Sequence, residues 1–493
     1  MRASYARPAV LVGIGAVLAV VAFQLWITPS NPPGFHRDEA ANAYNAYTLS
    51  TGLRDEDGAR LPLFFRSFDD YKSPLYPYLL AAVFEVTGPE AQVARGMSAV
   101  LVLAAVLLLG LLARRLTGSN LVAVVVVVLA GVTPWLFELG RVALEVSTQP
   151  LLIVLLLISL ERTWRRGRWT LPEGVVAGVV LGLLVYSYTG SRLLGPLLAA
   201  ALAVFAGRGR WRWLLAAWAT FAILLVPIGV YALRHPGALT ARYEQTTIAR
   251  DGRSSLEVAL EAIGNWFKDA NPWHWATGGD PAPYVHNGGY GALYAAVVAL
   301  AIAGAVLVLV RERGNLWWRY VLVATLLVPI PAALTVDRYN ALRLAALPVF
   351  VLTLAIPAIA ALVEAARTRT LARVVAGVLA VAVVVQFAQF IDEYRTRGPG
   401  RVVLFEAGVG PLLDPVFDDG ETIYVDYDDR GAQVEARWHA VERGIPAERI
   451  VVLPDGGVPP PGSVVLGLFQ ECDFTCDEFA RWEGYRLARA VGS

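Results

Sequence analysis

Two acidic residues stand side by side shortly after the first hydrophobic stretch of the sequence. They are Asp38 and Glu39 in GFHRDEAANAYNAYTLSTG, where apolar and aromatic residues follow at helical spacing. A carboxylate here can cap the helix, because it complements the positive end of the helix dipole. A positioned carboxylate can also act as a general base that accepts the proton of an attacking hydroxyl group. The stretch alone leaves both interpretations open.

Basic residues stand near the ends of several other hydrophobic stretches. They are Lys72, Arg141, Arg192, Arg338 and Arg343. Each can extend towards lipid headgroups, as interfacial cations do, or can hold a phosphate group. Arg343 falls inside the start of an apolar helix, where an unpaired guanidinium is costly and a bound phosphate would offset the cost. Arg141 and Glu145 are spaced so that a helix would place both on one face.

Polar and aromatic residues of the same loops are further candidates for substrate binding. Together with Arg141 and Arg338, they are Asp70, Tyr186, Tyr188, Asp280 and His286. Interfacial tyrosines also form the aromatic belts of membrane proteins, and Asp70 with its acidic neighbour could form either a weak cation site or a hydrated turn. His274, Asp280 and His286 match no standard metal-binding spacing. We therefore assign no metal ligand and no firm cofactor, and a divalent cation stays an open alternative.

The composition is that of a membrane protein. Of 493 residues, 56% are hydrophobic and 17% are charged, whereas soluble domains have about 25% charged residues. Apolar stretches of about 15–23 residues suit helices that cross a hydrocarbon core about 30 Å thick. The segment 74–86 is too short to cross and is expected to lie at the interface. We place about eleven spans near residues 8–28, 93–113, 119–139, 142–160, 174–189, 192–206, 213–234, 288–310, 317–335, 342–364 and 370–391.

Loop charges predict the orientation of these spans. With the N-terminus in the cytoplasm, alternate crossings bring every short, strongly basic loop to the cytoplasmic side. The first loop (31–92), the long loop (235–287) and everything after residue 391 then lie outside the cytoplasm. The acidic pair and the five cations lie on that side too. Because Lys and Arg are depleted there by the same rule, these cations need another purpose, and binding a lipid phosphate is one.

Residues 392–493 predict a small α/β domain. TIYVDYDD, RIVVLP and SVVLGLF are strand-like, and AQVEARWHAVERG has the period of an amphipathic helix. We expect this domain to lie outside the cytoplasm, after a transmembrane catalytic domain of residues 1–391. The only cysteines, Cys472 and Cys476, are expected to form a disulfide there, with two free thiols as the alternative.

The motifs resemble, in order, those of GT-C membrane glycosyltransferases, in the superfamily of protein O-mannosyltransferases and the aminoarabinose transferase that modifies lipid A. The resemblance covers about residues 8–391 and implies that Asp38 is the general base and that Lys72 and Arg343 contact the donor phosphate. A serine separates Lys72 from Pro74, which departs from the Lys-Pro pattern of the family. Arg95 matches a family arginine to which we assign no role. The motifs are HRDEAANAYNAY, DDYKSPLYPYLLA, EAQVARGMSAVL, GRVALEVS, YSYTGSRLLGP and DRYNALRLAALP.

The resemblance also implies the reaction. Donors in this superfamily are polyprenyl or dolichyl monophosphate sugars, and the sugar is transferred with inversion at its anomeric carbon. We expect an inverting glycosyltransferase that uses a polyprenyl-phosphate sugar and an unidentified envelope glycan, lipid or protein, with membrane lipids but not nucleic acid as further partners. In this reading Asp38 and Glu39 are catalytic, and Lys72, Arg192 and Arg343 bind the donor phosphate.

Two other functions are weaker interpretations of the same residues. A transporter or flippase should show paired broken helices near the membrane midplane, whereas the ionisable residues here gather at one predicted face. A phosphoethanolamine transferase would need a Ser or Thr nucleophile beside a metal cluster, and the sequence shows no such cluster.

Overall fold

The computed structural model describes residues 2–68, 70–250, 252–468 and 475–491. The chain forms two compact units, and each is assembled from several segments. The first unit contains residues 1–26, 98–142 and 146–394, and the second contains residues 27–97, 143–145 and 395–493. The C-terminal tail therefore shares a compact unit with the first predicted loop.

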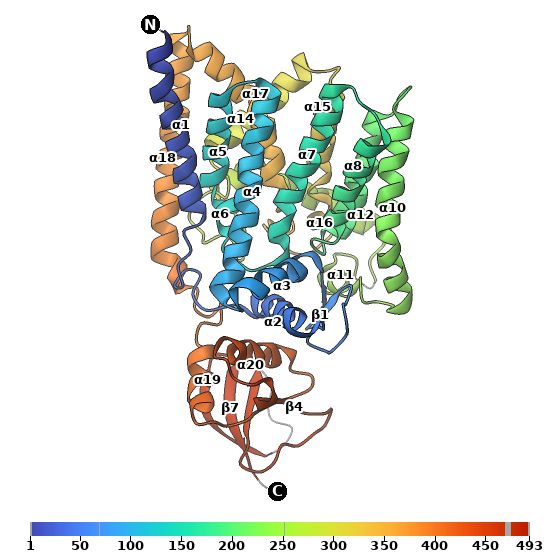
Figure 1. Ribbon diagram of the computed structural model, residues 1–493, viewed down its shortest axis with the longest axis vertical. Coiled ribbons are helices and arrows are strands. Elements are labelled where there is room, and N and C mark those ends of the chain that lie inside the picture. Colours follow the sequence, from blue (N-terminus) through green and yellow to red (C-terminus); the bar gives the residue numbers. More distant parts are fainter. Residues whose placement is uncertain (1, 69, 251, 469–474, 492–493) are drawn as a thin grey trace. The chain divides into compact units, whose positions relative to one another are not determined.

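The first unit is helical (Figure 1). Neighbouring helices run alongside one another, and α1 and α18 meet through the rings of Phe23 and Phe387, whose centroids are 5.4 Å apart. Its helices, including the larger part of α4, are α1 (Arg2–Gln24), α4 (Ala91–Thr117), α5 (Asn120–Val132), α6 (Pro134–Leu139), α7 (Gln149–Arg166), α8 (Leu171–Val185), α9 (Ser191–Ala201), α10 (Trp211–Arg234), α11 (Ala241–Thr246), α12 (Ser255–Asp269), α13 (Pro272–Thr277), α14 (Ala295–Arg311), α15 (Leu316–Leu327), α16 (Ile330–Ala333), α17 (Leu347–Ala366) and α18 (Thr370–Arg397).

The described helices agree with a polytopic membrane protein. Among them, six helical segments are long and apolar enough to cross a membrane: Ala91–Thr117, Glu145–Arg166, Trp211–Arg234, Leu316–Ala333, Leu347–Ala366 and Thr370–Gly400. Shorter apolar helices lie at the other five predicted spans, and another, Leu75–Thr87, lies where an interfacial helix is expected. The mainly helical fold is thus confirmed, and the number of eleven spans stays a prediction.

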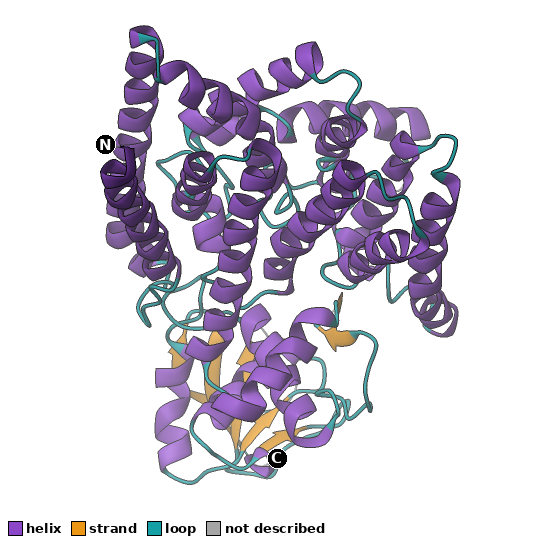
Figure 2. Cartoon of the chain, turned by 45° about the horizontal axis from the view of Figure 1, so that its top comes forward, coloured by secondary structure: helices purple, strands orange, loops and turns teal. Residues whose placement is uncertain are grey.

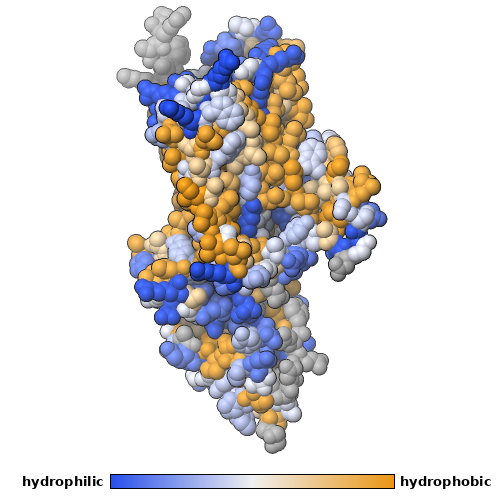
Figure 3. All heavy atoms as spheres, turned by 90° about the vertical axis from the view of Figure 1, so that its right-hand side faces the viewer, coloured by the Kyte–Doolittle hydropathy of each residue, from blue (hydrophilic) through white to orange (hydrophobic). Residues whose placement is uncertain are grey.

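Glycine allows the closest helix contacts in this unit. A side chain at Gly174 or Gly178 of α8 would collide with backbone atoms of α10, and one at Gly304 of α14 would collide with the carbonyl of Leu354 in α17. Small residues at such spacing let helix backbones approach in membranes, where van der Waals packing replaces the hydrophobic effect. Outward faces instead carry exposed apolar side chains, such as Ile223 of α10, and Figure 3 shows hydrophobic atoms gathered over the helices.

The second unit contains all the described strands (Figure 2). Helices α2 (Arg37–Gly52) and α3 (Leu75–Thr87) flank an antiparallel hairpin of β1 (Phe65–Ser67) and β2 (Asp70–Lys72). The tail adds helices α19 (Val409–Asp418) and α20 (Arg430–Glu442). Its sheet has the order β4-β3-β5-β7-β6, from β3 (Ile423–Val425), β4 (Ile450–Val452), β5 (Val464–Leu468), β6 (Cys476–Trp482) and β7 (Tyr485–Ala490).

The predicted α/β character of the tail is confirmed. The three strand-like stretches form β3, β4 and β5, which run parallel, and the amphipathic stretch forms α20. Buried Val425 and Leu466 of the sheet pack with Ala436 of α20 and Leu413 of α19. Strands β7 and β6 extend the sheet in antiparallel fashion. The bond expected between the two cysteines lies outside the described residues at Cys472.

Candidate active site

Helix α2 begins with a capping box that separates the roles of the two neighbouring acids. The Nδ1 atom of His36 accepts a hydrogen bond from the backbone N–H of Asp38 (3.0 Å), and Oε2 of Glu39 accepts one from the backbone N–H of His36 (3.1 Å). Such reciprocal bonds satisfy N–H groups that have no partner inside the helix. Glu39 therefore serves the cap, and the carboxylate of Asp38 stays available for another partner.

Glu39 is held in place by a buried ion pair. The guanidinium of Arg95 donates from Nε (2.9 Å) and Nη2 (2.7 Å) to the two oxygens of Glu39, and both side chains are only 1% exposed. The backbone N–H of Ala143 donates to Oε1 of Glu39 (2.8 Å). A bidentate pair of this kind fixes geometry as well as charge. These contacts favour a positioning role for Glu39. They also assign a role to Arg95, which holds Glu39 in place.

Asp38 pairs with Lys72, which comes from β2. The Nζ atom of Lys72 lies 2.7 Å from Oδ1 of Asp38. The lysine side chain is 8% exposed, whereas the aspartate side chain is 40% exposed. Burial lowers the pKa of Lys72, but the carboxylates of Asp38, Glu145 and Asp70 raise it by more, so that the net pKa lies above its ordinary value. Lys72 is therefore a stable ammonium ion beside an accessible carboxylate.

Glu145 joins the surroundings of this pair. Its Oε2 atom accepts a hydrogen bond from Asn42 of α2 (3.2 Å), and Asn42 also donates to the carbonyl of Ala143 (3.1 Å). Glu145 is buried and contributes to the field that raises the pKa of Lys72. The sequence offered one signal for it, an acidic residue at the mouth of a predicted span.

The helical pairing predicted for Arg141 and Glu145 is wrong. Residues 140–144 form a turn, and a 3-10 helix (Glu145–Thr148) begins only after it. Arg141 belongs to the first unit, where it donates to the carbonyls of Phe23 (3.1 Å) and Gln24 (2.8 Å) and lies over the ring of Phe137. These contacts bury Arg141 within that unit, and its role in substrate binding stays a prediction.

The predicted arginines of the external loops also lie in the first unit. Arg343 donates from Nη1 to Asp337 (2.7 Å) and to the hydroxyl of Thr335 (2.8 Å). Arg338 donates from Nη1 to the buried carboxylate of Asp269 (2.7 Å). Among the remaining candidates of this unit, Arg192 donates to the carbonyl of Leu239 (3.1 Å) and Tyr186 donates to that of Leu224 (2.6 Å), while Tyr188 lies in the turn before α9.

Asp280 and His286 tie loop segments together. The carboxylate of Asp280 accepts from the backbone N–H groups of Ala282 (2.8 Å) and Ala341 (2.7 Å), and burial raises its pKa to about 6 although both bonds oppose the shift. His286 makes a hydrogen bond from Nε2 to the carbonyl of Tyr290 (2.9 Å), and burial lowers its pKa. In the second unit, the carboxylate of Asp70 accepts from its neighbouring backbone N–H. Their predicted role in substrate binding stays a prediction.

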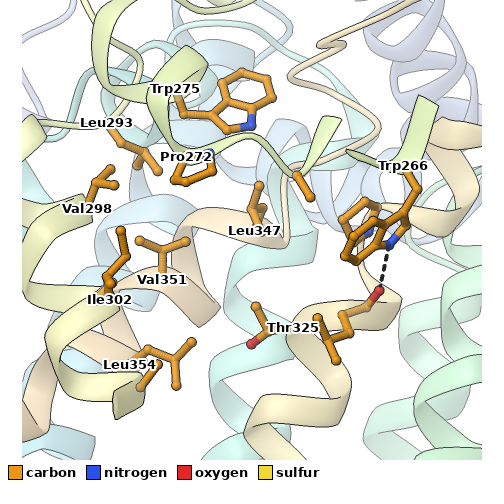
Figure 4. A pocket seen from close by; sticks show the side chains of 15 residues that line it. Trp266, Pro272, Trp275, Leu293, Val298, Ile302, Thr325, Leu347, Val351 and Leu354 are labelled. Carbon is orange, nitrogen blue, oxygen red and sulfur yellow. Dashed lines mark hydrogen bonds between the residues drawn. The ribbon is translucent and has the colours of Figure 1, made fainter. Parts of the chain in front are cut away.

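An apolar pocket opens between α12, α14, α15 and α17 (Figure 4). Its volume is about 240 Å³. Trp266 closes one side and donates from its indole to the carbonyl of Leu326 (2.9 Å). We call it the Trp266 pocket. Ala270, one of its lining residues, directly follows Asp269, which is the partner of Arg338. Leu347, another lining residue, directly follows the segment that carries Arg343.

Comparisons with known proteins agree with this architecture. The family model of dolichyl-phosphate-mannose-protein mannosyltransferases matches residues 71–232. The fold is similar to that of ArnT from Cupriavidus metallidurans, both bound to undecaprenyl phosphate (TM-score 0.60, 13% identity, 99% of this chain and 98% of that chain) and in the apo state (TM-score 0.59, 13% identity, 98% of both). No curated protein matches the sequence.

A more distant similarity is to the apo form of the oligosaccharyltransferase from Archaeoglobus fulgidus, with a TM-score of 0.51 and 14% identity over 89% of this chain and 64% of that one. The family model and a fold shared along nearly the whole chain confirm the resemblance to GT-C membrane glycosyltransferases of the protein O-mannosyltransferase and ArnT superfamily.

Proposed function

We propose that this protein is an inverting glycosyltransferase that moves a sugar from a polyprenyl-phosphate donor to a hydroxyl group at the extracytoplasmic face of the membrane. The observation that carries the proposal is the pair of Asp38 and Lys72, an accessible carboxylate 2.7 Å from a buried ammonium group. One is the group that a hydroxyl acceptor needs, and the other is the group that a departing phosphate needs.

In the proposed reaction Asp38 acts as the general base. It takes the proton of the acceptor hydroxyl while that oxygen attacks the anomeric carbon from the side opposite the phosphate. A new bond forms between the acceptor oxygen and the anomeric carbon as the bond to the phosphate oxygen breaks. The polyprenyl phosphate leaves with the bonding electron pair, so the configuration inverts. A correctly placed general base contributes about 10²- to 10⁴-fold to the rate.

Lys72 is proposed to neutralise the leaving phosphate. It is paired with Asp38 in the structure, and a phosphate oxygen would compete for the same ammonium hydrogens. Transfer of these hydrogen bonds from Asp38 to the phosphate would free a lone pair of the carboxylate when the donor binds. This exchange would couple donor binding to activation of the base.

The first unit supplies features that suit the lipid part of the donor. The Trp266 pocket is lined by aliphatic and aromatic side chains, as expected for a site that takes an isoprenoid chain. We propose that Arg343, with Arg192, contributes to binding of the donor phosphate. Arg338 is proposed to act in substrate binding by holding Asp269 in place.

The experiment compares three purified proteins in lipid vesicles: the natural sequence, Asp38→Asn and Asp419→Asn. Asp419 is a matched control because it is an exposed aspartate at the end of α19. Each protein receives radiolabelled polyprenyl-phosphate hexose or pentose and a crude envelope extract as acceptor. Asp38→Asn should lose at least about 100-fold of the transfer rate, and Asp419→Asn should keep it. Unchanged transfer by folded Asp38→Asn would reject Asp38 as the base.

A further inference from the structure

A second hollow of the first unit lies at the ends of α4 and α14, beside the start of α15 and the middle of α17. Its volume is about 440 Å³, within the range of sites for small organic ligands. We call it the Arg311 groove, after a residue that lines it with Glu312 and Trp318. None of the residues assigned above to the reaction lines it.

One wall of the groove is apolar. Leu116 of α4, Leu307 and Val308 of α14, and Ile356 and Pro357 of α17 contribute to it. Leu116, Leu307 and Val308 lie near the ends of helices that are predicted to cross the membrane, and Ile356 and Pro357 lie in the middle of another such helix. An acyl chain of a membrane lipid fits such a wall, because neither has a polar group to satisfy.

The other wall carries two opposite charges that do not neutralise each other. Arg311 is exposed, and its guanidinium makes no hydrogen bond or ion pair with another residue of the described chain. Glu312 forms no ion pair there either, and its Oε2 atom accepts a hydrogen bond from Asn315 (3.2 Å). Asn315 is itself fixed, because its Oδ1 atom accepts from the backbone N–H groups of Trp317 (3.1 Å) and Trp318 (3.4 Å). The groove therefore presents a free cation beside a carboxylate that is held in position.

An indole donor completes the polar wall. Trp318 is 6% exposed, and within the described part of the chain its indole N–H has no hydrogen-bond partner, whereas its backbone N–H is bonded to Asn315. A largely buried tryptophan normally finds a partner for this group. A phosphate or ester oxygen of a lipid would supply one.

We propose that the Arg311 groove binds the headgroup of a phospholipid that carries both a phosphate and an amine, as phosphatidylethanolamine does. Arg311 binds the phosphate, Glu312 binds the ammonium group, and the acyl chain lies along the apolar wall. A guanidinium and a carboxylate are the natural partners of these two charges. Because the loop at 311–319 is one of those predicted to be cytoplasmic, the lipid comes from the cytoplasmic leaflet. This site does not depend on the proposed transferase activity.

The test is native mass spectrometry of the full-length protein in detergent, titrated with phosphatidylethanolamine or with phosphatidylglycerol, which lacks the amine. The natural protein should bind phosphatidylethanolamine at least about fivefold more tightly than phosphatidylglycerol, because one charge-assisted hydrogen bond contributes about that factor or more to affinity. Arg311→Ala should weaken this binding about tenfold. Arg313→Ala is the matched control, because the Nε of Arg313 is already bonded to the carbonyl of Leu309.

Two further variants and one competitor make the result decisive. Arg311→Lys should retain most of the binding, and Glu312→Gln should abolish the preference for phosphatidylethanolamine over phosphatidylglycerol. Equal binding of the two lipids by the natural protein, or equal losses in Arg311→Ala and Arg313→Ala, would overturn the proposal. So would full displacement of the lipid by millimolar inorganic phosphate, which would identify a site for free phosphate instead.

Discussion

Removal of the guanidinium of Arg95 should show what holds the start of α2. Arg95 gives two hydrogen bonds to Glu39 and one to the carbonyl of Pro32 (2.9 Å), and its guanidinium lies 5.3 Å from the ring centroid of Phe35. Arg95→Met keeps much of the side-chain volume but leaves a carboxylate that is 1% exposed without its counterion. Breaking a buried pair from one side costs about 3–5 kcal/mol of the free energy of unfolding.

The double variant separates charge from packing. In Glu39→Gln with Arg95→Met no unpaired charge is buried, so the loss should be smaller than in Arg95→Met alone by about 1 kcal/mol or more. The double variant and the two single variants would be measured by unfolding in SDS-containing mixed micelles, with sugar transfer measured in parallel. Arg95→Met should also lower kcat, because Arg95 holds Glu39 at the start of α2 and Asp38 lies in the same turn of that helix.

Two results would refute this reasoning. One is an Arg95→Met protein within about 1 kcal/mol of the natural protein, which would mean that the pair contributes little. The other is a double variant whose loss equals the sum of the single losses, because independent sites behave in that way.

The remaining predictions concern charge, pH and packing. Lys72→Met should lower sugar transfer at least about 100-fold, as loss of one oxyanion-stabilising donor does elsewhere, whereas Lys72→Arg should keep part of the rate; equal activity in all three proteins would contradict the phosphate role. Burial raises the pKa of Glu435 from 4.5 to about 8, although Arg37 opposes the shift, so the folded state holds a proton that the unfolded state loses between these values, and the free energy of unfolding should fall as the pH rises through this window. In Glu435→Gln this fall should shrink by up to about 1.4 kcal/mol per pH unit. If thermal unfolding of Glu435→Gln shows the same pH profile as the natural protein, Glu435 does not cause the fall. Gly304→Ala should destabilise the protein by about 1–3 kcal/mol through its collision with α17, whereas Gly377→Ala, with open space around it, should not; similar thermal unfolding midpoints for the two would refute the close packing.

Local patterns in the sequence predicted the elements better than their partners. The apolar stretches and the tail strands follow from hydrophobic period and length, and they appear where expected. The helix start near Asp38 was visible too, but the sequence could not tell which acid serves the cap. That choice depends on Arg95 and on the backbone N–H of Ala143, which lie 56 and 104 residues from Glu39.

Errors arose where a regular period was extended across a break. Arg141 and Glu145 have helical spacing, yet Gly140 ends α6 and a turn follows it. For Asp280 and His286 the role in substrate binding stays a prediction, and the sequence did not indicate their partners within the chain, because a Gly/Pro-rich loop has no regular period. In the structure those partners are backbone groups, which residue type alone does not reveal.

The cap formed by His36 has a consequence for the tautomer of its ring. An imidazole nitrogen accepts a hydrogen bond only when it carries no hydrogen, so the bond from the backbone of Asp38 to Nδ1 requires the tautomer with hydrogen on Nε2. Nitrogen-15 chemical shifts of His36 would therefore report whether the first turn of α2 is intact, without any measurement of catalysis.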